Sequence, residues 1–155
     1  KAFDDISVLE ICKEAHVSTS SFYRHYKDKY DVMNDNYKRI LDQYMHSSQN
    51  HNYEDVFINL FNMSKELHYL KNAFDYTGIN SLGDFIYQYS YNTVIWMCKR
   101  KNIQFEDKDL LLLDVFCGGA SIMYQHYILG KFDLSPQQAD KTLYQIFPNV
   151  FKISW

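Results

Sequence analysis

The chain has 155 residues, enough to bury a hydrophobic core, and 46% of them are hydrophobic. Gly 5 and Pro 2 are too few for a sheet protein rich in turns, so the composition favours an all-α fold. The net charge of -3 means that any contact with nucleic acid depends on a local basic patch, because the chain as a whole repels phosphates.

The first predicted element is a short helix that begins at Ser7. Ser7 and Glu10 have the spacing of a capping box, in which each side chain accepts a hydrogen bond from a backbone N–H at the helix start. The apolar residues recur at helical spacing and form one narrow stripe: Val8, Ile11, Cys12 and Ala15. The chain opens at Lys1 in what resembles the end of a helix, so we expect a preceding first helix to be truncated.

A second short helix is predicted after a break at residues 16–18. Val17 is the expected buried plug of this turn, and Ser18 is the expected N-cap of the new helix. Phe22 and Tyr26, four residues apart, would share its inward face. The outward face carries hydroxyl, phenol and cationic groups, which suit phosphates and base edges: Thr19, Ser20, Ser21, Tyr23, Arg24 and His25.

A third, longer helix is predicted from Asp28 onward. Asp28 can cap it, with Asp31 three residues further on. Its apolar stripe consists of Tyr30, Met33, Tyr37, Ile40, Leu41 and Tyr44. We expect this helix to connect the N-terminal unit to the rest of the chain.

The run from Ile6 to Asp31 resembles the signature of the tetracycline-repressor (TetR) family. The family's Ala-x-Val-Ser, Phe-Tyr-x-His-Phe and Lys-x-Lys elements are matched at 15–18, 22–26 and 27–29. Two positions depart from the pattern: Tyr26 stands where the family usually has Phe, and Tyr30 where it usually has Glu.

This resemblance implies a one-component transcription regulator that binds double-stranded operator DNA as a homodimer. It also implies a helix-turn-helix domain at 1–45 and a helical regulatory and dimerisation domain at 46–155. The spacing of the C-terminal part resembles the subgroup that includes the dihydroxyacetone-kinase operon activator.

The resemblance also assigns roles to single residues of the N-terminal unit. Ser7 and Lys29 would contact phosphates, Tyr23 and His25 would contact the DNA backbone or base edges, and Thr19, Ser20 and Arg24 would read sequence. The complete set of DNA-binding candidates is Ser7, Ser18, Thr19, Ser20, Ser21, Tyr23, Arg24, His25, Lys27 and Lys29. Singly, each is more often a cap or a solvated surface group, but their combination is characteristic.

The remaining two thirds of the chain predict further helices. Apolar residues keep a helical period at 53–70 and again at 82–89, with Gly78 and Gly83 bracketing the break between them. A last helix should begin at Ser135 and end near Phe147, because Pro148 lacks the N–H that a helix needs.

The segment 110–129 is apolar on most of its circumference, so it needs more cover than one short chain readily supplies. The glycines at 118 and 119 suggest either a close approach between helices or a kink. We therefore expect a dimer interface formed by Phe116, Ala120, Met123, Tyr127, Leu143, Ile146, Phe147 and Val150.

Aromatic side chains in the central part could line a pocket for a small apolar or aromatic effector, although such residues are more often core. The expected lining is Phe61, Tyr69, Phe85, Tyr89, Asn92 and Trp96, with Gln88 or tyrosine hydroxyls as polar contacts. The alternative is a TetR-like coactivator or corepressor controlled by a protein partner. A helical interaction module without DNA binding is a third class, but it leaves the polar face of the second helix unexplained.

Neither the histidine spacing nor any glycine-rich loop predicts a metal, a cofactor or a catalytic site, so we do not expect an enzyme. Three widely spaced cysteines are too few for a disulfide framework and fit a reducing cytoplasm. The stretch 110–129 is interrupted by polar residues, and no signal peptide is visible. We therefore expect a cytoplasmic protein without a membrane span.

Overall fold

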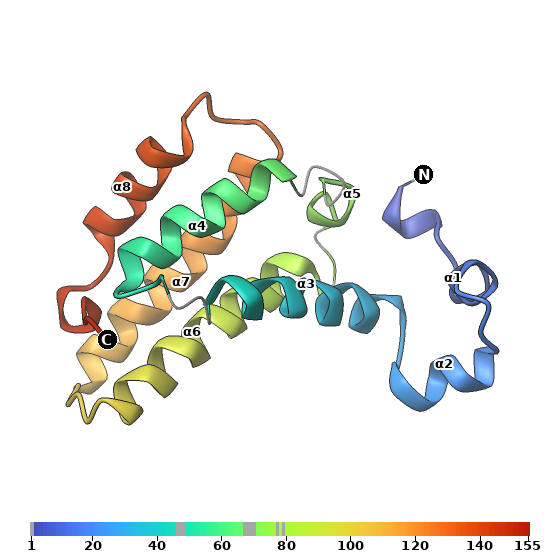
Figure 1. Ribbon diagram of the computed structural model, residues 1–155, viewed down its shortest axis with the longest axis horizontal. Coiled ribbons are helices and arrows are strands. Elements are labelled where there is room, and N and C mark those ends of the chain that lie inside the picture. The colour runs from blue at the N-terminus through green and yellow to red at the C-terminus, as the bar shows by residue number, and fades with distance from the viewer. Residues whose placement is uncertain (1, 46–48, 67–70, 77, 79) are drawn as a thin grey trace.

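Helices at the two ends of the molecule are joined by one long helix (Figure 1). The computed structural model describes residues 2–45, 49–66, 71–76, 78 and 80–155. At one end lies a small head, residues 2–28, with η1 (Phe3–Asp5), α1 (Val8–Glu14) and α2 (Thr19–His25). α3 (Lys29–Met45) runs from the head into a bundle of four helices: α4 (Tyr53–Glu66), α6 (Leu82–Arg100), α7 (Asp107–Ile128) and α8 (Pro136–Ile146). The short helices α5 (Lys71–Phe74) and η3 (Asn149–Phe151) complete the chain.

Strand pairing in the described residues is limited to one isolated bridge between Asn52 and Ser154, so the all-α prediction is confirmed. None of the helices in the described part of the chain combines the length and the apolar character needed to cross a bilayer. The predicted domain boundary at residue 45 coincides with the end of α3, but α3 also packs against α4 and α6. The division into two domains therefore stays a prediction.

Helix starts are capped largely as the sequence predicts. Glu10 N donates to Ser7 Oγ at 3.2 Å, and Ser7 N donates to Glu10 Oε2 at 2.8 Å, which completes the capping box of α1. Ser135 and Gln138 form a second capping box at the start of α8. α8 then ends before Pro148, as expected. Local sequence alone therefore determines these boundaries.

Aromatic rings join α4, α7 and α8 in the core of the bundle. The centroid of the Phe147 ring lies 5.4 Å from that of Phe57 and 4.9 Å from that of Phe116. The Tyr53 ring packs edge-on against both Phe147 and Trp155, at 5.0 Å in each case. These contacts hold α8 and the C-terminal tail on α4.

This packing corrects part of the predicted dimer interface. Leu143 and Phe147 are buried in the chain's own core, with 6% and 2% exposed, because the apolar stripe of α8 turns onto α4. Both predictions were wrong. The half-buried members of the set also pack against this core: Phe116, Ala120, Met123, Tyr127 and Val150. Ile146, with 68% exposed, still points to solvent.

A different face of α7 is apolar and exposed. Its residues, which we call the α7 stripe, are Leu111, Leu112, Val115, Gly119 and Ile122; the four larger side chains are between 55% and 67% exposed. α7 is continuous through its two glycines, and a Cβ added to Gly118 or Gly119 would meet no atom within 4 Å. Contacts within the described chain therefore explain neither the stripe nor the glycines.

The structure also bears on two predictions for the middle of the chain, the role of Gly83 and the extent of the helix that begins at residue 53. Gly83 lies inside the first turn of α6, whose N-cap is Ser81, so it does not bracket the break that precedes this helix. The predicted helix over 53–70 is described as α4 as far as Glu66, and residues 67–70 lie outside the described part of the chain.

Candidate functional site

The turn between α1 and α2 gives the head its shape. His16 adopts a left-handed conformation, with φ of 54°, and its N–H donates to Lys13 O at 3.3 Å. Val17 N donates to Cys12 O at 2.9 Å, so the end of α1 has the hydrogen-bond pattern of a Schellman motif. Val17 itself is 46% exposed, which corrects its predicted role as a buried plug. The chain reverses here through backbone hydrogen bonds.

α2 packs on α1 through one buried face. Ser18 Oγ accepts a hydrogen bond from Ser21 N at 3.0 Å, which confirms Ser18 as the N-cap. Phe22 and Cys12 are 5% and 2% exposed and form the small core of the head. The Phe22 and Tyr26 rings are 5.7 Å apart, so both contribute to the inward face as predicted.

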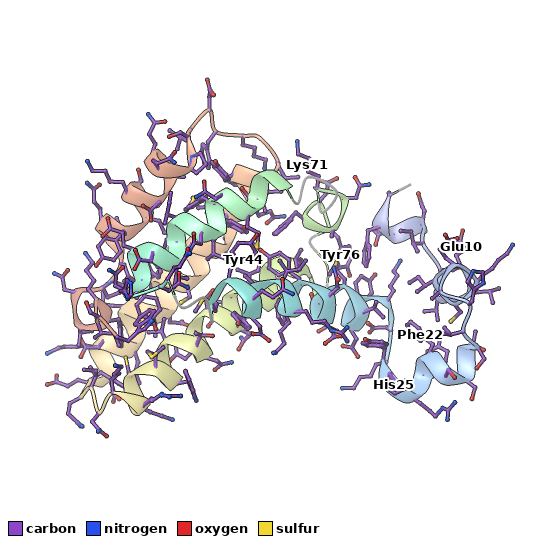
Figure 2. The ribbon with its side chains drawn as sticks, in the orientation of Figure 1. Glu10, Phe22, His25, Tyr44, Lys71 and Tyr76 are labelled. Atoms are coloured by element: carbon purple, nitrogen blue, oxygen red, sulfur yellow. The ribbon has the colours of Figure 1, made fainter. Side chains whose placement is uncertain are left out.

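The opposite face of α2 is polar and open to solvent. Its exposed candidates for DNA contact are Thr19, Ser20, Tyr23, Arg24 and His25, and Ser21 is half-buried beside them. Arg24 Nη2 donates to Ser21 Oγ at 3.0 Å, which orients the guanidinium along the helix. Figure 2 shows the side chains of this helix at the end of the molecule farthest from the bundle, where Phe22 and His25 are labelled. A surface of this kind can enter a DNA groove without obstruction by the bundle.

Lys29 has a role that the sequence did not predict. Its Nζ donates to three backbone carbonyl oxygens at the end of η1: Phe3 at 3.0 Å, Asp4 at 2.8 Å and Ile6 at 3.0 Å. An ammonium group has three N–H donors, so these bonds use all of them. The geometry therefore makes Lys29 a clamp between η1 and α3, and it leaves no donor for the phosphate contact that the resemblance implies. Lys27 is exposed, and its Nζ makes no such hydrogen bonds to carbonyl oxygens in the described part of the chain.

The two departures from the family pattern each have a structural role. Tyr26 Oη donates to Asp35 Oδ2 at 2.9 Å, a bond that phenylalanine could not make, and this bond raises the pKa of Tyr26. The Tyr30 ring stacks on that of Tyr76 at 4.7 Å and lies 5.5 Å from the Phe3 ring. A hydrogen bond with Tyr76 raises the pKa of Tyr30 to about 12.

Phe3, Tyr30 and Tyr76 form an aromatic junction between the head and the bundle. Tyr76, labelled in Figure 2, follows α5, which packs against α6 and α7 of the bundle. The junction therefore connects the segment after α5 to η1 and α3. A Cβ added to Gly78 would lie 2.1 Å from Tyr76 Oη, so this ring position requires glycine at 78. No periodicity in the sequence indicates this contact, because it joins residues far apart in the chain.

The residues predicted to line a ligand pocket fall into two adjoining spaces. Phe61 and Tyr89 line an inner cavity of about 70 Å³ whose walls come from α3, α4, α6, α7 and α8. Phe85, Tyr89, Asn92 and Trp96 line an outer groove of about 570 Å³ between α3 and α6. Tyr69 lies outside the described residues. The sequence thus predicted members of both spaces but could not separate the cavity from the groove.

Polar contacts connect these spaces to α3. Tyr89 Oη donates to Asp42 Oδ1 at 2.6 Å, and Lys38 Nζ pairs with the other oxygen of the same carboxylate at 2.6 Å. Gln88 and Asn92 add amide groups to the outer groove. Within the described ranges, no three His, Cys, Asp or Glu side chains gather closely enough to hold a metal ion.

A polar helix presented at the end of a helix–turn–helix head defines the class of protein as one that binds DNA. Residues 1–35 match the family model described as "Bacterial regulatory proteins, tetR family", and the match covers α1, α2 and the start of α3. It supports a TetR-type DNA-binding transcription regulator, as the resemblance predicted. No curated protein matches the chain.

Proposed function

We propose that the protein is a dimeric repressor of the TetR type whose binding to operator DNA is released by a small molecule. The observation that carries this proposal is the course of α3. Its first turn is clamped to the head through Lys29, while Tyr37 and Leu41 of the same helix line the inner cavity. A molecule that binds beside α3 therefore acts on the element that positions the head (Figure 1).

The α7 stripe supports the dimer. A palindromic operator needs two heads related by a two-fold axis, and a two-fold axis brings the same surface of each copy together. Four large apolar side chains on one face of a 22-residue helix form such a self-complementary surface. The uncovered glycines at 118 and 119 permit two α7 helices to approach closely.

The exposed face of α2 supports the assignment of the DNA contacts. Thr19, Ser20 and Arg24 lie at its exposed surface and are the proposed readers of sequence. Tyr23, His25 and Lys27 are the proposed phosphate and backbone contacts. We revise the proposed task of Lys29 to holding η1, for the geometric reason given above.

The proposal is tested by DNA binding with and without candidate effectors. The protein is titrated against a duplex that carries the DNA flanking its own gene and against a shuffled duplex of the same composition. Small apolar and aromatic compounds are then added to the specific complex. Selective binding that one class of compound reverses is the expected result. Equal affinity for both duplexes would contradict the proposal.

A protein-controlled coactivator or corepressor is the second candidate, and the size of the inner cavity favours it. A cavity of about 70 Å³ leaves the bundle nearly filled, as expected for a regulator that answers to a protein. If no compound alters operator binding, while a purified protein partner does, this second candidate replaces the first.

A further inference from the structure

Two tyrosines that line the inner cavity, Tyr37 and Tyr53, have buried hydroxyls without a hydrogen-bond partner in the described part of the chain. Tyr37 interacts with the neighbouring Tyr124, so Tyr53 is the one whose hydroxyl the fold does not use. Tyr53 lines the cavity, is 2% exposed, and its hydroxyl has no hydrogen-bond partner in the described part of the chain. Burial raises the pKa of Tyr53, and the nearby thiols of Cys98 and Cys117 raise it further, so the hydroxyl stays protonated and able to donate. Buried hydroxyls without a partner are rare in folded proteins, and this one belongs to a side chain in the wall of a cavity.

The rest of the cavity wall selects for small, apolar molecules. Its lining is mainly aliphatic and aromatic, including Val56, Phe57, Ile86, Val94, Phe116 and Leu143. A cavity that binds benzene, with its six non-hydrogen atoms, measures about 150 Å³, so a volume of about 70 Å³ has room for about two to four non-hydrogen atoms. A benzene-sized ring is too large for a cavity of this volume.

We propose that the inner cavity binds a compact, largely apolar molecule with one carbonyl or hydroxyl oxygen, held by a hydrogen bond from Tyr53. The chemical class is that of a short ketone or alcohol. This inference rests on the proposed function only for its consequence, the release of DNA. The binding itself follows from the cavity and the unpartnered hydroxyl.

Tyr89 is the gate through which such a molecule enters. Met45, Tyr89 and Thr93 line both the inner cavity and the outer groove, so they form the wall between the two spaces. The Tyr89 hydroxyl is held by Asp42 of α3 at 2.6 Å, with a further hydrogen bond from Thr93. Rotation of this side chain opens the cavity to solvent, and it breaks a bond between α6 and the helix that carries the head.

The first test uses acetone and xenon as probes of the full chain. Acetone has four non-hydrogen atoms and accepts a hydrogen bond, whereas xenon fills apolar cavities without hydrogen bonding. For so few atoms the dissociation constant is no tighter than about 0.04 mM, so NMR titration extends to about 100 mM. Shifts at the methyl groups of Val56 and Ile86 report occupancy of the cavity.

Tyr53→Phe separates a ligand contact from a structural role. We expect it to weaken acetone binding about tenfold and to leave xenon binding at least as strong as in the wild type. Tyr144→Phe is the matched control, because it removes a half-buried hydroxyl on α8 that does not line the cavity, and it should leave both probes unaffected. Acetone binding that is absent, or that is equal in wild type and Tyr53→Phe, would overturn the proposal.

Tyr89→Phe tests the gate by kinetics. Without the bond to Asp42, the exchange rate of acetone measured by NMR line shape should rise several-fold, while its dissociation constant changes by less than about twofold. Tyr91→Phe on the same helix is the control and should change neither quantity. A Tyr89→Phe protein that exchanges acetone at the wild-type rate would show that entry follows another path.

Operator binding distinguishes the failure of this inference from the failure of the proposed function. If acetone binds in the cavity but leaves operator binding unchanged, the site stands and its regulatory consequence is wrong. If another compound releases the operator while neither probe enters the cavity, the proposed function stands and this site is wrong.

Discussion

A single charge on the α7 stripe should separate the proposed dimer. Val115, 67% exposed, lies near the middle of the stripe, with Leu111 and Ile122 toward its two ends. We therefore choose Val115→Glu as the perturbation. Because a two-fold axis repeats each residue, one substitution places two carboxylates in the same interface.

The expected effect follows from the exposed surface of the stripe. Full burial of an aliphatic side chain is worth about 1.5–3 kcal/mol, and slightly more than half of each of the four side chains is still exposed, so each contributes about 1–1.5 kcal/mol. Eight such side chains in a pair supply about 8–12 kcal/mol before the cost of association. Two buried, unpaired carboxylates cost at least about 6 kcal/mol, which raises the dissociation constant by a factor of about 10⁴.

Sedimentation velocity at micromolar concentration measures the result. We expect wild type as a dimer and Val115→Glu as a folded monomer with unchanged helical content by circular dichroism. Leu9→Glu is the matched control, because Leu9 is 68% exposed on α1 and should leave the dimer intact. A wild-type monomer, or a Val115→Glu dimer, would refute the reasoning. Ile146→Glu tests separately whether α8 joins the interface.

Three further predictions concern the head and the acidic end of α4. Lys27→Met should lower the slope of log affinity for DNA against log salt by about 1, at unchanged thermal stability. Lys29→Met should instead cost about 1–3 kcal/mol of stability, because three carbonyl groups lose their hydrogen bonds. A Lys29→Met protein with full stability and a lower slope would show that Lys29 contacts phosphate after all. His16→Gly should raise the free energy of unfolding by about 0.5–1 kcal/mol, because glycine adopts a φ of 54° without steric cost, and chemical denaturation that shows a loss instead would contradict this. Burial raises the pKa of Asp140 to about 6, and the nearby carboxylates of Glu54 and Asp55 contribute to this rise. The folded state therefore binds this proton more tightly than the unfolded chain does. The protein consequently loses stability as the pH rises from about 4 through 6. Asp140→Asn should therefore raise the melting temperature at pH 7.5 and leave it nearly unchanged at pH 4, and an equal change at both values would disprove this.

The elements of the head could be predicted because their signals are local. The capping box of Ser7 and Glu10, the N-cap Ser18 and the cap Asp28 each act within three residues, so sequence spacing determines their geometry. The same holds for the start of α8 at Ser135. The polar face of α2 followed from the helical period once these ends were known.

The interface and the cavity could not be predicted in the same way, because they depend on long-range packing. α7 is apolar around most of its circumference, so periodicity does not show which side meets the chain's own core and which side is left exposed. Lys29 bonds carbonyl groups 23 to 26 residues away, and Tyr30 meets Tyr76, contacts for which sequence spacing gives no signal. The sequence shows many aromatic residues in the bundle, but it does not show which space each of them lines. Only the structure places Tyr53 at the inner cavity and Trp96 at the outer groove.

The central claim is that α2 reads operator DNA. Fluorescence anisotropy with a duplex from the DNA flanking the protein's own gene, compared with a shuffled duplex at the same salt concentration, tests it most directly. We predict that the wild type binds the specific duplex at least about 10³-fold more tightly, and that Arg24→Ala removes most of this preference. Equal affinity of the wild type for both duplexes, or a preference that survives Arg24→Ala combined with Thr19→Ala, would contradict the claim.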